Sequence, residues 1–329
     1  MNPKSGTLII SLDFELLWGI RDFAGEKKAK SILLTRQVVP RLLDLFQKYG
    51  VHATWATVGF LFFESRSELL AALPKQKPNY VQHSLSPYEN LTNELGENEQ
   101  ADPLHYAPSL IRHIVQAPYQ ELATHTFSHY YCLEDGQTSE DFEHDLKAAL
   151  QAAVPYGPTI QSIIFPRNQY SDSYLDACGK NNILAYRGTE SAWFRQSRSR
   201  RAHRQWYRRL MRLADAYINI SGTNTYPNPS TSDRPVNLPS SRYLRPYSKR
   251  LEILEPLRLK RILASLSHAA QVGEVFHLWW HPEDFSENIE DNLRFLEAIL
   301  KCYQELHRLY GMQSRSMGEV AHEVFGFSK

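Results

Sequence analysis

Short apolar runs that end in polar residues alternate with helical segments along this chain. The first run, TLIISLDF (Thr7–Phe14), has the β-branched composition of a buried strand, and helical spacing follows over Thr35–Tyr49, up to the stop signal Gly50. Further strands are expected in HATWATVGF, QELAT, SIIFPRN, ILAYRG and EVFHLWWHP, and further helices over 138–154, 171–181, 256–271 and 286–310. Strands that alternate with helices predict an α/β fold with a mainly parallel sheet covered by helices.

The length of 329 residues fits a single domain, because α/β barrels commonly exceed about 250 residues. Two stretches interrupt the alternation. One lies at about 74–118 and is rich in Pro, Asn and Gln over much of its length, and the other lies at about 190–255 and carries an arginine-rich run. We expect both to be insertions in one domain of residues 1–329. Barrels place their chemistry at the C-terminal ends of the strands, where every candidate residue below falls.

Composition excludes several classes of protein. Hydrophobic residues make up 42% of the chain and charged residues 22%, and no apolar run reaches the roughly 18 residues that a membrane helix needs. The N-terminus lacks the pattern of a secretory signal. Cys132, Cys178 and Cys302 are far apart without a CxxC motif, so neither a disulfide framework nor a cysteine metal site is expected. These features predict a cytoplasmic protein.

Two carboxylates, Asp13 and Glu15, stand two residues apart at the end of the first strand, in SLDFE. Alternate residues of a strand share a face, so both side chains can point into one site while Phe14 packs on the other side. The structural alternative is that these carboxylates only cap the strand and form salt bridges. The sequence alone leaves both interpretations open.

Two histidines, His125 and His129, stand four residues apart in HTFSH, directly after an expected strand. On a helical turn their Cβ atoms would lie about 5–6 Å apart, which suits two bonds of about 2.1 Å to one metal ion. A carboxylate from Asp13 or Glu15 would complete a His₂–carboxylate set with an open position, the pattern of a catalytic metal site. In the alternative, the histidines bind no ion and the hydroxyl residues between them only shape a turn.

A second pair, His277 and His281, has the same spacing in HLWWHP, but its aromatic and valine neighbours predict a strand. Four residues along a strand span about 13 Å, which is too far for both imidazoles to bind one ion. We therefore expect His281 at the mouth of the site as a lone acid or base, with His277 one layer deeper as a packing or supporting residue. The alternative is that His281 caps the next helical segment together with Asp284.

Taken together, these motifs resemble those of the polysaccharide deacetylases, the NodB-like carbohydrate esterases. That family combines an acidic motif on the first strand, a His-x-x-x-His motif, an Arg/Pro motif and a late strand that ends in a catalytic histidine. SLDFE, HTFSH, FPRN and LWWHP stand in the family's order, from Asp13 to His281. The resemblance implies a distorted (β/α) barrel and a divalent metal ion, with zinc as the expected ion.

The resemblance also implies roles for individual residues. His125 and His129 match the metal histidines, and Asp13 matches the general base. The family's usual second aspartate is replaced here by Phe14, so Glu15 takes the place of the metal carboxylate, as in relatives with an acid-x-acid motif. Which of the two carboxylates binds the metal stays open.

The later motifs match less closely. Arg167 in FPRN is similar to the family's arginine and is expected to pair with and orient Asp13. The backbone donor for an oxyanion is expected near Asn168 or Gln169.

Three residues are expected to bind substrate or to support the catalytic groups: Asn168, Trp280 and Glu190. Glu190 and Trp193, in TESAWF, resemble an acid and tryptophan motif whose carboxylate orients the catalytic histidine. A surface glutamate beside a packed tryptophan is the simpler interpretation.

The activity that the resemblance implies is hydrolysis of an N-acetyl group on a sugar. The cation activates water, Asp13 takes a proton, and His281 protonates the departing amine, which leaves acetate and a free amino sugar. A cytoplasmic location then suggests a role in bacterial surface polysaccharide biosynthesis. Two alternatives remain: a glycosidase that uses Asp13 and Glu15 as a carboxylate pair, and a catalytically degenerate relative that binds only sugar or metal, suggested by Phe14.

An arginine-rich segment runs from Arg195 to Arg212 and concentrates the positive charge of the chain. It holds eight of the 37 basic residues and no acid, so 29 basic residues face 36 acidic ones elsewhere. It is a solvated helix face, a surface for anionic lipid at the inner membrane face, or a docking site for a phosphate-rich substrate such as a lipid-linked or nucleotide sugar. Nucleic acid is not an expected partner, because the rest of the chain is acidic.

Overall fold

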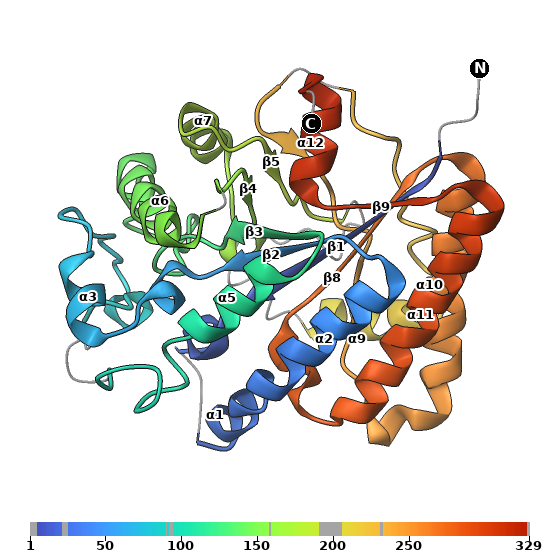
Figure 1. The fold of residues 1–329 in the computed structure, drawn as a ribbon, viewed down its shortest axis with the longest axis horizontal. Helices are drawn as coiled ribbons and strands as arrows, with labels where there is room; N and C mark the ends of the chain where they lie inside the picture. Colours follow the sequence, from blue (N-terminus) through green and yellow to red (C-terminus); the bar gives the residue numbers. More distant parts are fainter. Residues whose placement is uncertain are drawn as a thin grey trace.

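A parallel sheet runs through the centre of the computed structural model, which describes residues 5–21, 26–89, 91, 95–157, 159–190, 206–230 and 233–327. The order of its strands is β6-β5-β4-β3-β2-β1-β8-β7, with β9 beside β1 (Figure 1). All of these pairings are parallel. The strands are β1 (Thr7–Phe14), β2 (Ala53–Thr57), β3 (Gln120–Thr124), β4 (Ser162–Ile163), β5 (Ala185–Tyr186), β6 (Val236–Asn237), β7 (Arg242–Tyr243), β8 (Val275–Trp280) and β9 (Gln313–Arg315).

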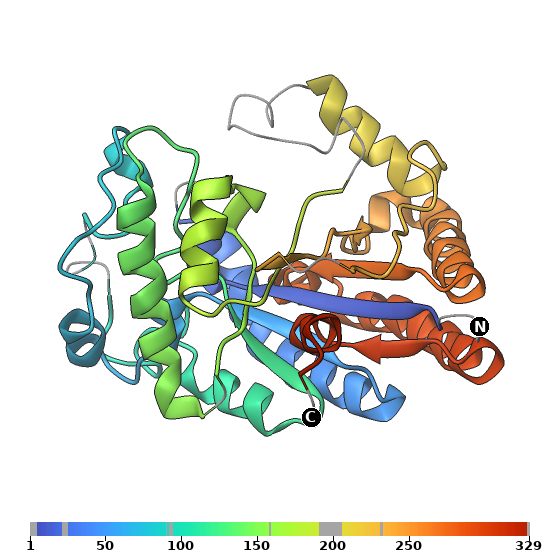
Figure 2. The ribbon, with the colours of Figure 1, turned by 90° about the horizontal axis from the view of Figure 1, so that it is seen from above.

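Helices lie around this sheet in both ribbon views (Figures 1 and 2). They are α1 (Glu26–Leu33), α2 (Thr35–Tyr49), α3 (Arg66–Ala71), α5 (Pro108–Gln116), α6 (Ser139–Ala153), α7 (Asp172–Lys180), α9 (Trp206–Tyr217), α10 (Glu255–Val272), α11 (Ile289–Tyr310) and α12 (Met317–Phe325). The expected helix over Thr35–Tyr49 is confirmed, and it ends because Gly50 adopts a left-handed conformation with φ 59°. Among the described residues, none of the helices is both long and apolar enough to cross a membrane.

The sheet curls until its two edges meet through a short connecting segment. β6 and β7, its two edge strands, are consecutive in sequence, and residues 238–241 join them. Within this segment, Ser240 N donates to Gly188 O next to β5, and Ser241 N donates to His277 O on β8. The segment therefore bonds to both sides of the opening, and the expected distorted (β/α) barrel is confirmed.

Elements of the central fold lie inside both of the stretches that were expected to be insertions. α5, inside the stretch 74–118, packs on β3 as the helix that leads into that strand. β6 and β7, inside the stretch 190–255, belong to the central sheet. The two strands were missed because each has only two residues, too few for any periodicity to show.

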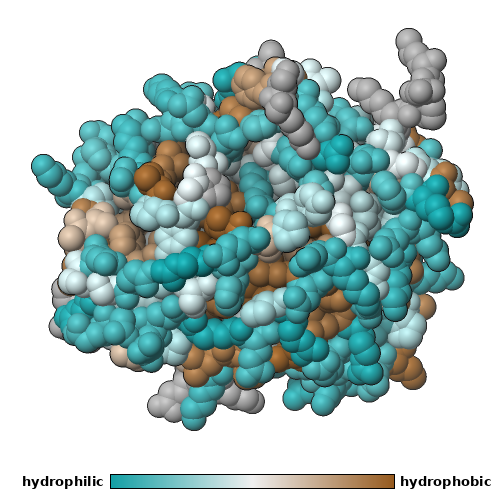
Figure 3. Space-filling view, in the orientation of Figure 1, coloured by the Kyte–Doolittle hydropathy of each residue, from teal (hydrophilic) through white to brown (hydrophobic). Residues whose placement is uncertain are grey.

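The interior of the barrel changes from apolar to polar along β1. Ile9 lies in an apolar cluster with Met317 and Val320 of α12, which covers one end of the barrel. The next residues on the same face are Ser11 and Asp13, and both are buried. The polar residues thus collect at the C-terminal end of the strand. The face of the molecule seen in Figure 3 is mostly hydrophilic, with apolar patches between the hydrophilic residues.

Candidate active site

The two carboxylates of SLDFE lie in one pocket at the C-terminal end of β1. Asp13 and Glu15 line this pocket of about 420 Å³ together with His129, Trp279 and His281. The neighbour between the carboxylates, Phe14, points the other way and packs edge-on against Trp55, with ring centroids 6.4 Å apart. The prediction that the two acids face one site is confirmed.

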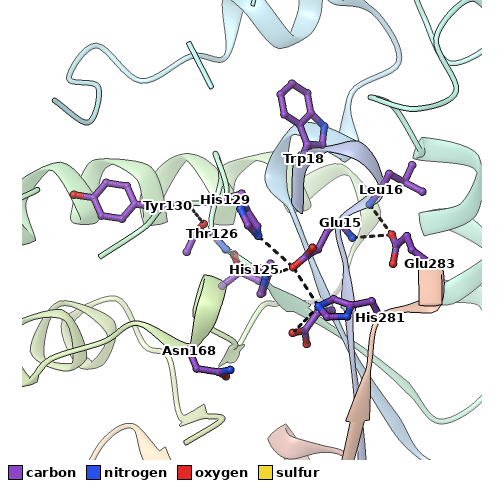
Figure 4. A network of polar contacts seen from close by, with 12 residues as sticks. Glu15, Leu16, Trp18, His125, Thr126, His129, Tyr130, Asn168, His281 and Glu283 are labelled. Carbon is purple, nitrogen blue, oxygen red and sulfur yellow. Dashed lines mark hydrogen bonds and ion pairs between the residues drawn. The ribbon is translucent and has the colours of Figure 1, made fainter. Parts of the chain in front are cut away.

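Glu15 is the carboxylate that contacts both histidines of HTFSH. Its Oε1 lies 2.8 Å from Nε2 of His125 and 3.2 Å from Nε2 of His129 (Figure 4). The two imidazole rings are 5.1 Å apart, and the three side chains are buried. A methyl group on Gly19 would lie 1.5 Å from Oε2 of Glu15, so this carboxylate takes its position because residue 19 has no side chain.

The loop that presents the two histidines is not helical, so the turn assumed from their spacing is wrong. Thr126 has φ 64° and His129 φ 56°, left-handed values that are rare for residues other than glycine and very rare for a β-branched residue. Asp145 of α6 holds this shape, since it accepts hydrogen bonds from Phe127 N at 2.7 Å, from Ser128 N at 3.1 Å and from Ser128 Oγ. The imidazoles converge because the loop is pinned, not because they lie on successive helical turns.

We expect the change Asp145→Asn to loosen this loop, because an amide cannot accept all three hydrogen bonds. Hydrogen bonds to a charged group contribute about 1.5–3 kcal/mol, and residues that support metal ligands typically change metal affinity by about 10–100-fold. The variant should therefore lose stability in urea unfolding and bind zinc about tenfold or more weakly in a competition titration with a chromogenic chelator. Asp176→Asn, an exposed change on α7, is the control. Unchanged zinc affinity in Asp145→Asn would contradict the role given to this carboxylate.

The electrostatics of the cluster keep one imidazole neutral and the carboxylate charged. Burial lowers the pKa of His129 to about 4, although the facing charge of Glu15 opposes this shift. Burial raises the pKa of Glu15, but the facing imidazoles of His129 and His281 and the hydrogen bonds with the two HTFSH imidazoles outweigh it and hold that pKa well below its usual range. A neutral imidazole beside an ionised carboxylate is the form in which both groups bind a cation.

The donor set fits a divalent cation. Donor atoms on one ion at about 2.1 Å are about 3.0 Å apart at a right angle and about 3.4 Å apart at a tetrahedral angle, close to the two separations observed. Glu15, His125 and His129 each offer one ligand atom within 4.8 Å of the others. Within the described part of the chain, Nδ1 of His125 has no hydrogen-bond partner, and Nδ1 of His129 lies 3.2 Å from Nη1 of Arg21. That second contact would have to rearrange on binding, because ligation through Nε2 leaves the proton on Nδ1.

Asp13 is held by a different partner, Arg187. The guanidinium donates through Nη1 to Oδ1 at 2.6 Å and through Nη2 to Oδ2 at 2.7 Å, a bidentate pair with both side chains almost fully buried. Arg187 also lies over the ring of Trp279, 4.0 Å from its centroid. Asp13 is therefore fixed in orientation, next to the three-residue cluster.

His281 lies on the other side of the two carboxylates. Its Nε2 is 3.9 Å from both Oδ2 of Asp13 and Oε1 of Glu15, while its Nδ1 is 2.9 Å from Oδ2 of Asp284. Burial lowers the pKa of His281, but the carboxylates of Asp284, Glu15 and Asp13 more than reverse this and raise it to about 10. The imidazole is thus a proton-carrying group whose free nitrogen points at the carboxylate cluster.

Comparisons with known proteins agree with this arrangement. The sequence model of the polysaccharide deacetylase family matches residues 24–185, which include HTFSH and FPRN. By this match and by the site described above, the chain is similar to the polysaccharide deacetylase family. The match does not reach Asp13, Glu15 or His281, so those residues enter the site through the geometry described above. No curated protein matches the sequence.

Solved structures show that other deacetylase-like proteins share the fold. A putative polysaccharide deacetylase from Mycobacterium smegmatis has 14% identity and a TM-score of 0.59, with 98% of this chain and 92% of that chain covered. A probable polysaccharide deacetylase from Pseudomonas aeruginosa PAO1 has 10% identity and a TM-score of 0.58 over 98% and 92% of the two chains. A 4-alpha-glucanotransferase from Thermococcus litoralis has 11% identity and a TM-score of 0.53 over 96% of this chain and 40% of that one. At such identities the likeness concerns the fold alone.

The arginine of the deacetylase motif is not where the sequence suggested. Arg167 was expected to pair with Asp13, but its guanidinium lies over the ring of Tyr131 and 3.9 Å from Glu134. At this turn φ is 56° at Arg167 and 52° at Asn168, and although Arg167 lines the same pocket as Asp13, its guanidinium is held by these other partners. Arg187, directly after β5, takes the place instead.

The expected oxyanion donors of the deacetylase are already engaged. Asn168 N donates to Phe165 O and Gln169 N donates to Pro166 O, within one short turn. The side chain of Asn168 remains part of the site, since it lines the pocket and its Oδ1 lies 3.4 Å from Nη2 of Arg187. These two N–H groups are therefore already bonded, and an oxyanion donor near them stays a prediction, while that of Asn168 as a supporting residue agrees with the contacts.

The carboxylate that orients His281 is Asp284 and not Glu190. Asp284 accepts from the imidazole and also from the hydroxyl of Tyr243 at 2.7 Å. The capping alternative is correct as well, because His281 and Asp284 form a capping box for the short helical segment Pro282–Ser286. Glu190 is buried, not at the surface, and lines a neighbouring cavity. Trp193 lies outside the described residues.

Alternation along β8 decides which aromatic residue faces the deacetylase site. Trp279 lines the pocket, whereas Trp280, predicted to bind substrate or support the site, is fully buried on the opposite face against Phe46 and Phe285. His277 shares the face of Trp279 and contacts Ser11 Oγ at 2.8 Å, which in turn accepts from Arg187. The prediction that His277 lies one layer deeper, behind the site, is confirmed.

Glu283 was missed by the sequence analysis. It is buried in the pocket, and its Oε1 accepts hydrogen bonds from the backbone N–H groups of Glu15 and Leu16. Burial, with the nearby charge of Glu15, raises the pKa of Glu283 to about 7. Leu16 has φ 49°, so Glu283 stabilises the strained turn that directs Glu15 inward. Its place beside HP in the sequence is the only signal that could have indicated this role.

Proposed function

We propose that this chain is a metal-dependent deacetylase that hydrolyses an N-acetyl group on a sugar. The observation that carries the proposal is the position of Glu15 Oε1, within 3.2 Å of two imidazole nitrogens and 3.9 Å from a third imidazole on the opposite side. Two of these imidazoles and the carboxylate form a ligand set, and the third imidazole is free to transfer a proton.

The metal site in this proposal consists of Glu15, His125 and His129. A divalent cation bound there, with zinc as the expected ion, would lower the pKa of water and polarise the acetyl carbonyl group. Glu15 rather than Asp13 is the carboxylate of the set, because Asp13 has both of its oxygens engaged by Arg187.

The remaining groups divide the proton transfers between them. Asp13 accepts a proton from water, since its carboxylate is ionised in the pair with Arg187 and lies at the pocket wall. His281 donates a proton to the amine that leaves, because Asp284 holds its Nδ1 and directs Nε2 into the pocket. The C–N bond of an amide breaks readily only when the nitrogen is protonated, so this position of His281 supports amide hydrolysis.

Two alternative functions have less support. A glycosidase needs one carboxyl group of its pair protonated, but the pKa of Glu15 lies well below its usual range and Asp13 is in a bidentate salt bridge. A degenerate relative was suggested by Phe14 in place of a ligand. Glu15, the next residue, fills that role, so the ligand set is complete without a ligand at position 14.

The biological part of the proposal rests on the family alone. The substrate is an N-acetylated sugar, and we propose that it is a precursor in bacterial surface polysaccharide biosynthesis, processed in the cytoplasm. The proposal includes contact with the inner membrane face through the arginine-rich segment. Most of that segment, residues 195–205, lies outside the described residues.

The experiment that tests the activity is an acetate-release assay on N-acetyl sugars with metal analysis of the same protein. We expect one divalent ion per chain, loss of activity on chelation and recovery with zinc. The double variant His125→Ala/His129→Ala should bind no ion and release no acetate, while His144→Ala, an exposed change on α6, should behave as the parent protein. Activity that survives chelation would contradict the proposal, and so would a metal-loaded protein that releases no acetate from any N-acetyl sugar.

A further inference from the structure

A second cavity adjoins the catalytic pocket and is lined by arginines. It has a volume of about 260 Å³, and Asn168 and Trp279 belong to the walls of both spaces. Tyr243 lines the new cavity and donates its hydroxyl to Asp284, the partner of His281. A molecule in this cavity would therefore contact Tyr243, whose hydroxyl bonds to the carboxylate that holds His281, the proposed proton donor to the departing amine.

The arginines come from separate parts of the fold. Arg212 is on α9, Arg242 is on β7, Arg245 follows β7, and Arg258 is on α10. α9 and α10 lie side by side in Figure 2 and contact each other. Convergence of four guanidinium groups from three elements and a loop is not explained by a solvated helix face, which was one interpretation of the arginine-rich segment.

Carboxylates hold some of these arginines. Asp215 is fully buried and contacts both Arg242 and Arg261, and Glu255 contacts Arg258. Among the described residues, five guanidinium groups and three carboxylates lie in or next to the cavity. The groups counted are Arg212, Arg242, Arg245, Arg258 and Arg261 against Glu190, Asp215 and Glu255.

Arg245 is the arginine best placed to bind a ligand. Its backbone carbonyl accepts from Arg258, but its guanidinium forms no salt bridge or hydrogen bond with the described residues, and it lines the cavity. Arg245 is half-buried, whereas the fully buried Arg242 and Arg258 are held by Asp215 and Glu255. Arginine forms paired hydrogen bonds with phosphate and carboxylate oxygens, which makes an oxyanion the natural partner.

We propose that this cavity binds a phosphoryl group on the substrate, so that the N-acetyl sugar is deacetylated as a phosphorylated or phosphate-linked compound. A phosphoryl group carries about −1.5 to −2 charge at neutral pH and three strong acceptor oxygens, which suits a wall of several guanidinium groups better than the single charge of a carboxylate. The volume corresponds to about eight or nine water molecules at about 30 Å³ each, enough for more than one inorganic ion. The deacetylation of this compound rests on the proposed function, whereas the binding of its phosphoryl group does not.

The first experiment measures binding without turnover. Isothermal titration with glucose 1-phosphate, which has no acetyl group, is compared with methyl glucoside and with glucuronate at one fixed ionic strength. We expect glucose 1-phosphate to bind, and Arg245→Gln and Arg212→Gln each to weaken its Kd about ten- to hundredfold, the usual effect of losing charged hydrogen bonds. Arg250→Gln removes the same charge from an exposed position close in sequence and should leave the Kd unchanged. Equal affinity in all four proteins, or equal affinity for glucuronate and the phosphate ester, would overturn the proposal.

The second experiment measures acetate release from N-acetylglucosamine 1-phosphate and from its neutral methyl glycoside. The ratio of the two kcat/KM values should fall about tenfold or more in Arg245→Gln and stay constant in Arg250→Gln. A nucleoside diphosphate sugar and a lipid-linked diphosphate sugar, tested in parallel, distinguish the sources of the phosphoryl group. If glucose 1-phosphate binds through Arg245 but no acetate is released, the deacetylase function fails and the binding site remains. If neutral sugars are deacetylated and the ratio does not change, the binding site fails and the function remains.

Discussion

The change Arg187→Met is expected to lower both stability and activity, whereas Arg167→Met is expected to change neither by much. Arg187 is the bidentate partner of Asp13, and both side chains are almost fully buried. Removal of one member of a buried ion pair leaves the other charged without a partner, which costs about 3–5 kcal/mol. Arg167 contacts Tyr131 and Glu134, and about one fifth of its side chain is exposed, so its loss should cost less than the loss of the almost fully buried Arg187. The free energy of unfolding in urea measures the difference.

The matched test of this pair is the double variant Asp13→Asn/Arg187→Met. It removes both charges, so it should be more stable than Arg187→Met alone, while acetate release should stay about a hundredfold or more below the parent protein, because the general base is gone. Arg187→Lys should not restore activity, since an ammonium group cannot donate in the paired geometry of a guanidinium. If Arg167→Met were the variant that lost stability and activity, the arginine of the FPRN motif would be the true partner of Asp13.

Much of the site could be predicted from the sequence because strand alternation is a strict geometric rule. It placed Asp13 and Glu15 on one face with Phe14 on the other, and it separated His281 from His277 by one layer. The same rule, applied to the strand before His281, would have selected Trp279 instead of Trp280. Trp280 was predicted because it stands directly before His281 in the motif, without regard to the face of the strand on which its side chain lies.

The parts that failed depend on loops with unusual backbone conformations. Thr126, His129 and Arg167 all have positive φ values, which no spacing rule predicts for such residues. Their conformations are held by distant partners, such as Asp145 for the HTFSH loop. The direction of a side chain on such a loop is therefore a tertiary property, and Arg167 was misplaced for this reason.

The arginine-rich run indicated a binding surface, but the sequence could not show where in the fold that surface lies. The run from Arg195 to Arg212 was recognised as basic, but the arginines that meet Arg212 in the cavity come from β7, the loop after it and α10. Asp215, only three residues from Arg212, proved to be the buried partner of Arg242 and Arg261. A run of like charges in sequence thus marked one wall of a cavity whose other walls are remote in the chain.

Replacement of His281 with Asn is expected to slow amide hydrolysis far more than ester hydrolysis. If His281 protonates the departing amine, kcat on an N-acetyl sugar should fall about 10²–10⁴-fold, the usual contribution of a general acid. An aryl acetate releases a phenolate that needs no proton, so its kcat should fall by less than about tenfold, because the remaining groups still act. KM for the sugar should change little, since His281 contacts its own carboxylate partners and lies only at the pocket wall. Acetate release from both substrates by the same protein gives the comparison.

Two further variants make the result specific to proton donation. Asp284→Asn keeps the imidazole but weakens the partner that directs its Nε2 and supports its positive charge, so it should show the same bias against the amide, with a smaller loss than His281→Asn. His113→Ala, an exposed histidine change on α5, should have no effect on either substrate. Equal losses on amide and ester in His281→Asn would mean that this histidine acts before the C–N bond breaks, for example by holding the carboxylate cluster in place. This positioning role is the strongest alternative, because two carboxylates lie 3.9 Å from the imidazole. The comparison of amide and ester separates it from acid catalysis, because only cleavage of the bond to the leaving group depends on how basic that leaving group is.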